Sequence, residues 1–213
     1  MDVADTTPVK TLLFVALIAV IAAALVTASH VFTKDRIAAN QRARLMASLH
    51  SVLDLPDEQV DLNPTNLRVT DPLLGSDEPV DVFVIEQGEQ PVATIIAAVA
   101  PDGYNAEIQL LIGIKRDATI SGVRVVRHRE TPGLGDLIDI RKSDWILQFD
   151  ATSLERPALT EWAVDKDEGY FDSITGATVT PRAVVNAVKN TLLYYRAHQA
   201  ELFAAAARSI NNE

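Results

Sequence analysis

The first part of the chain contains 19 consecutive residues without a charge, from Thr11 to Ser29. In a helix this run spans about 29 Å, which is close to the hydrocarbon thickness of a bilayer. Ten of its residues are Leu, Ile, Val or Phe, and together they favour insertion by roughly 3 to 6 kcal/mol. The sequence therefore predicts one transmembrane helix over residues 11–33, after a short tail over residues 1–10.

A cleaved signal peptide is the competing interpretation, because the small residues before His30 loosely resemble a cleavage site. The apolar run is longer than the core of a usual signal peptide, and Lys10 is the only basic residue before it. A retained anchor is therefore favoured. Its orientation stays open, because four basic residues follow the run within residues 34–44 and, counted alone, place the rest of the chain in the cytoplasm.

Composition removes several kinds of chemistry. The chain has no cysteine, which excludes iron–sulfur clusters, thiolate zinc sites, thioether-linked haem, disulfides and cysteine nucleophiles. Its formal net charge of −10 argues against nucleic-acid binding, which needs clustered Lys and Arg. At 213 residues the chain can hold one medium domain in addition to the anchor.

The connector after the anchor is expected to cover residues 34–79. Apolar residues at helical spacing predict a helix over residues 34–53 that stops before Pro56. Residues 56–80 are rich in Pro, Asp and Asn and are expected to be irregular.

The remaining pattern predicts an α+β domain over residues 80–195. Strand-like runs lie at residues 80–87, 91–100, 108–115 and 119–128. Thr180 is predicted to cap a C-terminal helix that starts at Pro181 and continues into a helical tail over residues 196–213. The apolar face of this helix consists of Val184, Val188, Leu192 and Tyr195. A twisted antiparallel sheet backed by this helix is the economical architecture.

Most candidate sites fail on spacing. The Gly-Leu-Gly at residues 133–135 lacks the third glycine of a dinucleotide fingerprint. The four histidines show no metal-ligand spacing, and one pair, His128 with Glu130, cannot fill a coordination shell. No serine lies in a nucleophile elbow, so hydrolase chemistry is unsupported and no metal site is predicted.

The Thr-Gly-Ala-Thr stretch at residues 175–178 differs, because its parts serve one purpose. Gly176 permits close approach to the backbone, and Ala177 keeps the surface small. Thr178 lies just before the predicted helix, so a phosphate bound or attached at its hydroxyl would meet free N–H groups. A turn followed by a capped helix is the plain alternative.

The motif around this stretch resembles a known one. The sequence DSITGAT at residues 172–178 is similar to the flavinylation motif Asp-x-x-(Ser/Thr)-Gly-Ala-(Thr/Ser) of the FMN-binding domain family. The stretches APDGYNAEIQLLIGI, RHRETPGLGDLIDIRKSDWI and TGATVTPRAVVNAVK together resemble the G subunit of Rnf-type, or Rsx, electron-transport complexes. The short motif is shared with the C subunit of the Na⁺-translocating NADH:quinone reductase, but the compact length and the APDGY wording favour the Rnf subunit.

This resemblance implies a set of site residues. Thr178 would carry FMN through a phosphoester bond, and Asp172 would be recognised by the flavin transferase. The residues expected along the phosphate and ribityl chain are Thr175, Gly176 and Ala177. Those expected against the isoalloxazine ring are Glu130, Thr131, Pro132, Gly133 and Leu134, with Trp145 as a further candidate.

The resemblance also implies a location and a role. The subunit would be a single-pass protein of the bacterial inner membrane with its FMN domain in the periplasm, which contradicts the charge count. It would relay electrons between ferredoxin and NAD within a complex whose other membrane subunits carry flavin and iron–sulfur centres. That flow would be coupled to Na⁺ or H⁺ transport, and the subunit alone would catalyse nothing.

Two other functions remain open from the residues. A membrane-tethered flavin reductase would be active without partners. A membrane-anchored assembly module would use residues 175–178 as a helix cap and would hold no flavin.

Overall fold

The computed structural model describes residues 12–22, 47–53, 64–87 and 90–210. The chain divides into two compact units, residues 1–45 and 46–213. Residues 12–22 are helical, and this is all that is described of the first unit. Within the described residues, no helix has both the length and the apolar character needed to cross a membrane. The predicted tail over residues 1–10, the rest of the predicted anchor, residues 34–46 and 54–63 of the predicted connector, and residues 211–213 lie outside the described residues.

The second unit is built on one antiparallel sheet. Its five strands are hydrogen-bonded in sequence order, β1-β2-β3-β4-β5. They are β1 (Thr65–Val69), β2 (Val80–Gln87), β3 (Gln90–Ala100), β4 (Ile108–Lys115) and β5 (Ile120–Arg127). The four predicted strands are thus confirmed to within a residue at each end.

The first strand was not predicted. Residues 56–80 were expected to be irregular, and this is wrong for Thr65–Val69, which pairs with β2 from Thr65↔Val84 to Val69↔Val80. The strand has the alternating burial of a half-covered edge, but it is only five residues long. A short 3₁₀ turn, η1 (Pro72–Leu74), follows it. Such a short alternation gives a weak signal beside so many Pro, Asp and Asn residues.

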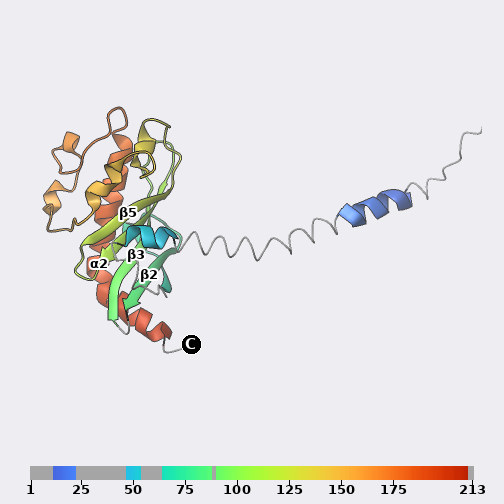
Figure 1. The fold of residues 1–213 in the computed structure, drawn as a ribbon, viewed down its shortest axis with the longest axis horizontal. Helices are drawn as coiled ribbons and strands as arrows, with labels where there is room; N and C mark the ends of the chain where they lie inside the picture. The colour runs from blue at the N-terminus through green and yellow to red at the C-terminus, as the bar shows by residue number, and fades with distance from the viewer. Residues whose placement is uncertain (1–11, 23–46, 54–63, 88–89, 211–213) are drawn as a thin grey trace, which may run out of the picture. The chain divides into compact units, whose positions relative to one another are not determined.

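Helix α2 (Val179–Ile210) covers one face of the sheet (Figure 1). Its predicted apolar face is confirmed, since the side chains concerned are at most 1% exposed. They are Val184, Val188, Leu192 and Tyr195. These residues form one core cluster with the inward side chains of the strands. This packing holds α2 in place against the sheet.

The opposite face of the sheet carries a second, smaller core cluster beneath residues 47–52, which are helical. Ser121 donates a hydrogen bond to the carbonyl of Val52 at 2.6 Å. The paired glycines Gly113 and Gly122 make room for this carbonyl, because added Cβ atoms would lie 2.5 and 3.1 Å from it.

Between β5 and α2 the chain forms short 3₁₀ turns, which gather near the start of α2 (Figure 1). They are η2 (Gly135–Ile138), η3 (Asp144–Phe149), η4 (Leu159–Glu161) and η5 (Asp165–Asp167). Their core is aromatic. Phe149 stacks on Phe171 with centroids 4.7 Å apart, and Trp162 lies 4.9 Å from Phe171. This cluster holds the segments that carry the candidate site.

Candidate functional site

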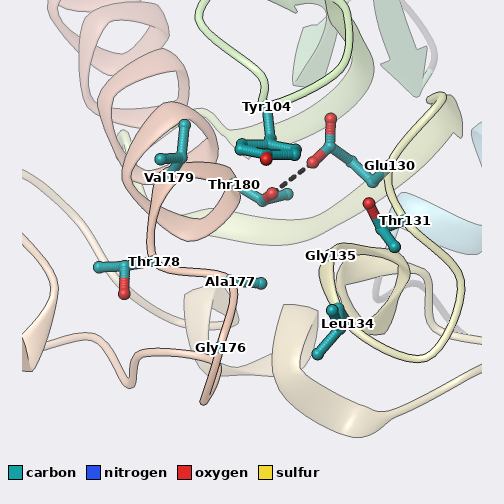
Figure 2. A pocket seen from close by; sticks show the side chains of 10 residues that line it. All are labelled: Tyr104, Glu130, Thr131, Leu134, Gly135, Gly176, Ala177, Thr178, Val179 and Thr180. Carbon is teal, nitrogen blue, oxygen red and sulfur yellow. Dashed lines mark hydrogen bonds between the residues drawn. The ribbon is translucent and has the colours of Figure 1, made fainter.

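A pocket of about 290 Å³ lies where three distant segments meet at the start of α2 (Figure 2). One wall is Tyr104, in the turn between β3 and β4. A second is the loop after β5, and the third is the segment that leads into α2. The lining residues are Tyr104, Glu130, Thr131, Leu134, Gly135, Gly176, Ala177, Thr178, Val179 and Thr180.

The helix begins earlier than predicted. α2 starts at Val179, and the carbonyl of Thr178 accepts a bond from the N–H of Arg182 at 3.4 Å, so Thr178 occupies the cap position. The prediction of Thr180 as cap is therefore wrong. The sequence was misleading because Pro181 suits any position in the first turn, where its missing N–H has no intrahelical partner to lose.

Thr180 instead faces the inside of the pocket wall. Its side chain is 1% exposed, and its hydroxyl donates to Oε2 of Glu130, which is itself 4% exposed (Figure 2). The other carboxylate oxygen of Glu130 accepts from the backbone N–H of Asn105 at 3.2 Å. Glu130 therefore connects all three walls of the pocket by hydrogen bonds.

Glycine makes this arrangement possible at the loop. A Cβ on Gly135 would lie 2.8 Å from Glu130 Oε2 and 2.9 Å from the Thr180 hydroxyl oxygen, closer than real Cβ atoms approach. Any side chain at this position would separate Glu130 from α2.

The loop after Glu130 holds its own shape. The carbonyl of Thr131 accepts from the N–H groups of Leu134 and Asp136 at 3.1 and 3.3 Å. The buried carboxylate of Asp136 accepts from the N–H of Gly133 at 2.6 Å. Gly133 has φ +76°, in the left-handed region where glycine is favoured. Leu134 is thereby presented at the mouth of the pocket with 41% of its surface exposed.

Thr178 is half-buried at the edge of the pocket. In Figure 2 the side chains of Ala177 and Thr178 leave the backbone on opposite sides, with Ala177 toward the loop that carries Leu134. The Thr178 hydroxyl accepts a hydrogen bond from the ammonium group of Lys166 at 2.9 Å. The hydroxyl oxygen of Thr178 thus lies next to a positive charge.

The structure brings together six of the residues predicted for the cofactor. Glu130, Thr131, Leu134, Gly176, Ala177 and Thr178 all line the pocket. Pro132 and Gly133 are exposed in the same loop without lining it, and Thr175 is exposed one residue before the pocket wall. Their roles toward a cofactor stay predictions.

Trp145 and Asp172 contact each other and do not line the pocket. The indole N–H of Trp145 donates to the carbonyl of Asp172 at 2.7 Å, and its ring packs edge-on against Phe149. The N–H of Asp172 donates to the side chain of Gln148 at 2.7 Å. Trp145 therefore supports the start of the Asp172–Thr178 segment, and it is not among the residues that line the pocket. Asp172 itself is exposed.

Sequence reasoning missed Tyr104, Gly135, Val179 and Thr180 as lining residues, and Lys166 as a neighbour of Thr178. Tyr104 lies in a turn between two strands, and Lys166 stands among acidic residues that look like a solvated surface. No local signal identifies them, because their proximity to the site arises from the tertiary fold.

A second charged group lies beside the loop. The buried carboxylate of Asp139 is held by the guanidinium of Arg141, whose hydrogen bonds keep the pKa of Asp139 below its ordinary value. His128 lies 4.0 Å from the same carboxylate. Among the residues that the structure describes, no three His, Asp or Glu side chains converge as a metal site would require.

Comparison with known proteins gives the class of this domain. Residues 103–193, which include the pocket and its three walls, match the family model of the FMN-binding domain. Residues 13–52 match the family model of the RnfG N-terminal region.

Whole-chain relatives narrow the class further. The chain is 45% identical over 197 residues to the G subunit of the ion-translocating oxidoreductase complex of Shewanella loihica, covering 91% of this chain and 92% of the relative. It is 42% identical to the corresponding G subunits of Pseudoalteromonas atlantica, with 91% of each chain covered, and of Aliivibrio fischeri, with 92% and 94% covered. The chain belongs to the family of G subunits of Rnf-type ion-translocating oxidoreductase complexes.

The residues of the pocket fit FMN. Three exposed apolar side chains, Tyr104, Leu134 and Val179, offer surface for a flat ring. Lys166 supplies a positive charge beside Thr178, which suits the phosphate of FMN. Gly176 leaves a gap that a Cβ would fill, since this Cβ would lie 3.2 Å from Leu134 Cδ2. A volume near the lower end of the usual range for ligand pockets suits a ligand that stays partly exposed.

Proposed function

We propose that Thr178 carries FMN through a phosphoester bond and that the subunit relays electrons within an Rnf-type complex. The observation that supports this most directly is that Thr178 lines the pocket and that its hydroxyl contacts the Lys166 ammonium group. The DSITGAT motif provides the matching sequence. The relatives are named as subunits of an ion-translocating oxidoreductase complex, which gives the relay its setting.

Under this proposal, loading of the cofactor would be a group transfer at Thr178. The hydroxyl oxygen of Thr178 would bond to the FMN phosphorus of FAD as the bond between the two FAD phosphates breaks, with AMP as the leaving group and the hydroxyl proton passing to solvent. The exposed Asp172 is available to the flavin transferase that performs this step with a divalent metal.

The other residues of the pocket position the cofactor. Glu130 and Thr180 hold the loop against the first turn of α2, so the two walls keep a fixed separation. Leu134 and Tyr104 line the pocket, where they would lie against the ring and reduce the access of water. When bound, FMN supplies the reversible uptake and release of electrons, while the protein fixes its place and its electrostatic surroundings.

The setting that we propose is the bacterial inner membrane. Residues 11–33 would anchor the chain in lipid by a single pass, and the FMN domain would face the periplasm. The apolar run and the match of residues 13–52 to the RnfG N-terminal region support this. The neighbouring subunits would carry flavin and iron–sulfur centres between ferredoxin and NAD, with Na⁺ or H⁺ transport coupled to the flow. The subunit alone would be an electron carrier without catalysis.

The test is covalent flavin on a denaturing gel under ultraviolet light. The full chain is expressed with its flavin transferase, alongside Thr178→Val, Thr178→Ser and, as a matched control, Thr160→Val, which changes an exposed threonine outside the motif and the pocket. We expect fluorescence in the wild type, in Thr178→Ser and in Thr160→Val, and none in Thr178→Val. Peptide mass spectrometry then locates the added FMN.

Other outcomes contradict the proposal in distinguishable ways. A dark wild-type band, with the transferase active on a known acceptor, would leave residues 175–178 as a helix cap and favour an assembly module. Fluorescence that persists in Thr178→Val would place the flavin elsewhere. Turnover of a small acceptor by the purified subunit would favour a stand-alone flavin reductase.

A further inference from the structure

The turn η5 consists of three successive charged residues, Asp165, Lys166 and Asp167, and each contacts the segment that begins with Asp172 and enters α2. The carboxylate of Asp165 accepts bonds from both the N–H and the hydroxyl of Ser173, the former at 2.9 Å. The carboxylate of Asp167 pairs with the guanidinium of Arg182 through two hydrogen bonds of 2.5 Å. The middle residue, Lys166, contacts the Thr178 hydroxyl.

The backbone of this turn is fixed. The fully buried side chains of Val164 and Phe171 flank it, and the two residues form a parallel bridge. The N–H of Asp165 donates to the carbonyl of Phe171 at 2.7 Å, and the N–H of Gly169 donates to the carbonyl of Val164 at 2.9 Å. A Cβ on Gly169 would lie 2.0 Å from the carbonyl oxygen of Ala163, so the chain can pass here only as glycine. The stem of Lys166 therefore starts from a defined place, although its head is exposed.

The Thr178 hydroxyl does not require a charged donor such as Lys166 to satisfy its hydrogen bonding. A neutral threonine oxygen is satisfied by any donor, and an exposed lysine loses rotamer freedom when it is held in one place. A phosphodiester at Thr178 carries a negative charge on two oxygens that are bonded to the same phosphorus as Oγ. Hydrogen bonds from an ammonium group to such oxygens are shorter and stronger than neutral ones.

From this geometry we infer that Lys166 is a binding residue for the phosphate of the flavin attached at Thr178, held in place by the Asp165 and Asp167 contacts on either side. This inference rests on the proposed function, since it requires a phosphoester at Thr178. Lys166 stabilises the negative charge as the Oγ–phosphorus bond forms, and it stays paired with the phosphodiester afterwards.

The first readout is the rate of loading. Full-length wild type, Lys166→Met and Lys166→Arg are incubated with limiting transferase and FAD, and in-gel fluorescence is followed with time. Lys166→Met keeps an apolar stem but no charge, and we expect loading to slow by roughly two- to fivefold, as for other exposed charge pairs. Lys166→Arg keeps the charge and should load at nearly the wild-type rate. The difference between wild type and Lys166→Met should shrink at about 1 M salt.

The second readout is the reactivity of the lysine itself, which recognition by the transferase cannot mimic. Wild-type protein is acetylated briefly before and after loading, and the labelled lysines are quantified by mass spectrometry. Lys166 should react at least twofold more slowly after loading. Lys142 is the internal control, because its side chain is 57% exposed and its acidic neighbour, Asp136, is separate from the attachment point.

The outcomes separate the two proposals. Loaded wild type with unchanged Lys166 labelling would overturn the inference and leave the proposed function standing. Equal loading rates for wild type and Lys166→Met would also overturn it. A wild type that takes no flavin, while a known acceptor does, would overturn both.

Discussion

The hydroxyl of Thr180 donates to the carboxylate of Glu130, which lies 50 residues earlier in the chain, and both side chains are buried. This bond joins the loop after β5 to the first turn of α2. Because the pocket lies between these two elements, this contact helps to set its width. A buried hydrogen bond of this kind contributes modestly to the free energy of unfolding. Removing one partner is more costly, because the other is left buried without a hydrogen bond.

Breaking this contact should lower stability. In Thr180→Val the shape of the side chain is kept, but the carboxylate of Glu130 loses a donor, and the free energy of unfolding should fall by about 1 to 3 kcal/mol. Glu130→Gln should cost about 1 to 2 kcal/mol, because the amide accepts from fewer donors than the carboxylate. Urea unfolding of both variants and of the double variant measures the coupling. Strict additivity would show that the two residues do not act as a pair.

The same carboxylate should also influence a bound flavin. A negative charge beside the pocket disfavours the more electron-rich reduced form, so Glu130→Gln should raise the midpoint potential by tens of millivolts. Redox titration of the loaded protein gives this value directly. Asp102→Asn, which changes an exposed acid on the β3–β4 turn, is the control. An unchanged potential in Glu130→Gln would exclude Glu130 as an electrostatic determinant.

Gly176→Ala should impair flavin loading severalfold. Gly176 has φ +82°, and an added Cβ would also crowd Leu134 at 3.2 Å, which narrows the gap between the two pocket walls. Gly133→Ala is a matched control, because its φ is +76° but no atom lies within 4 Å of an added Cβ. Both variants should lose about 1 kcal/mol of stability through backbone strain. Equal loading by the two would show that the gap at Gly176 is not used.

The η5 turn should weaken in acid. Hydrogen bonding to Arg182 lowers the pKa of Asp167, so its folded value lies below the ordinary 3.8. The contribution of this contact is therefore complete above the unfolded pKa and is lost as the pH falls through the folded pKa. Amide-exchange protection at Gly169 should be constant from about pH 5 to 8 and should drop below about pH 4. Asp167→Asn should show reduced protection throughout, and a wild-type loss that begins near neutral pH would contradict this cause.

The aromatic cluster should dominate the stability of the segment before α2. Phe149 is fully buried and stacks on Phe171, so Phe149→Ala should lower the free energy of unfolding by about 3 to 5 kcal/mol. Tyr170 contacts Phe171 edge-on but is 59% exposed, and Tyr170→Ala should cost less than about 1 kcal/mol. Denaturant unfolding of the two variants gives the comparison. Similar losses would mean that the cluster does not behave as a core.

The sheet could be predicted from sequence where the pattern was long. Strands β2 to β5 have eight or more residues each, with strong apolar runs bounded by turns, and their ends were located to within a residue. Strand β1 has five residues and only an alternating half-burial, so its signal was lost among polar neighbours. The start of α2 was misplaced because Pro181 is tolerated throughout a first turn, which makes it a poor marker of the first residue.

The residues of the candidate site also fall into those that the sequence pattern indicates and those that it does not. Residues 175–178 could be singled out because two threonines flank Gly-Ala just before a predicted helix, a pattern that suits a phosphate site. Tyr104 and Lys166 come from segments with no such pattern, and tertiary packing alone brings them to Thr178 and the pocket. The partnership of Glu130 with Thr180 is likewise invisible in sequence, since nothing local connects residues so far apart.

Helix α2 is the last element of the described chain, and it packs against β1, β2, β3 and β4. Thr178 stands immediately before it. Lys166 of η5 contacts Thr178, and Glu130 of the loop after β5 contacts Thr180 in the first turn of the helix. The surroundings of Thr178 therefore depend on segments that are distant in sequence and that only the folded domain brings together. A peptide of residues 172–178 would hold the motif without the pocket. Each flavin attached to the chain would thus mark a molecule whose folding had reached completion.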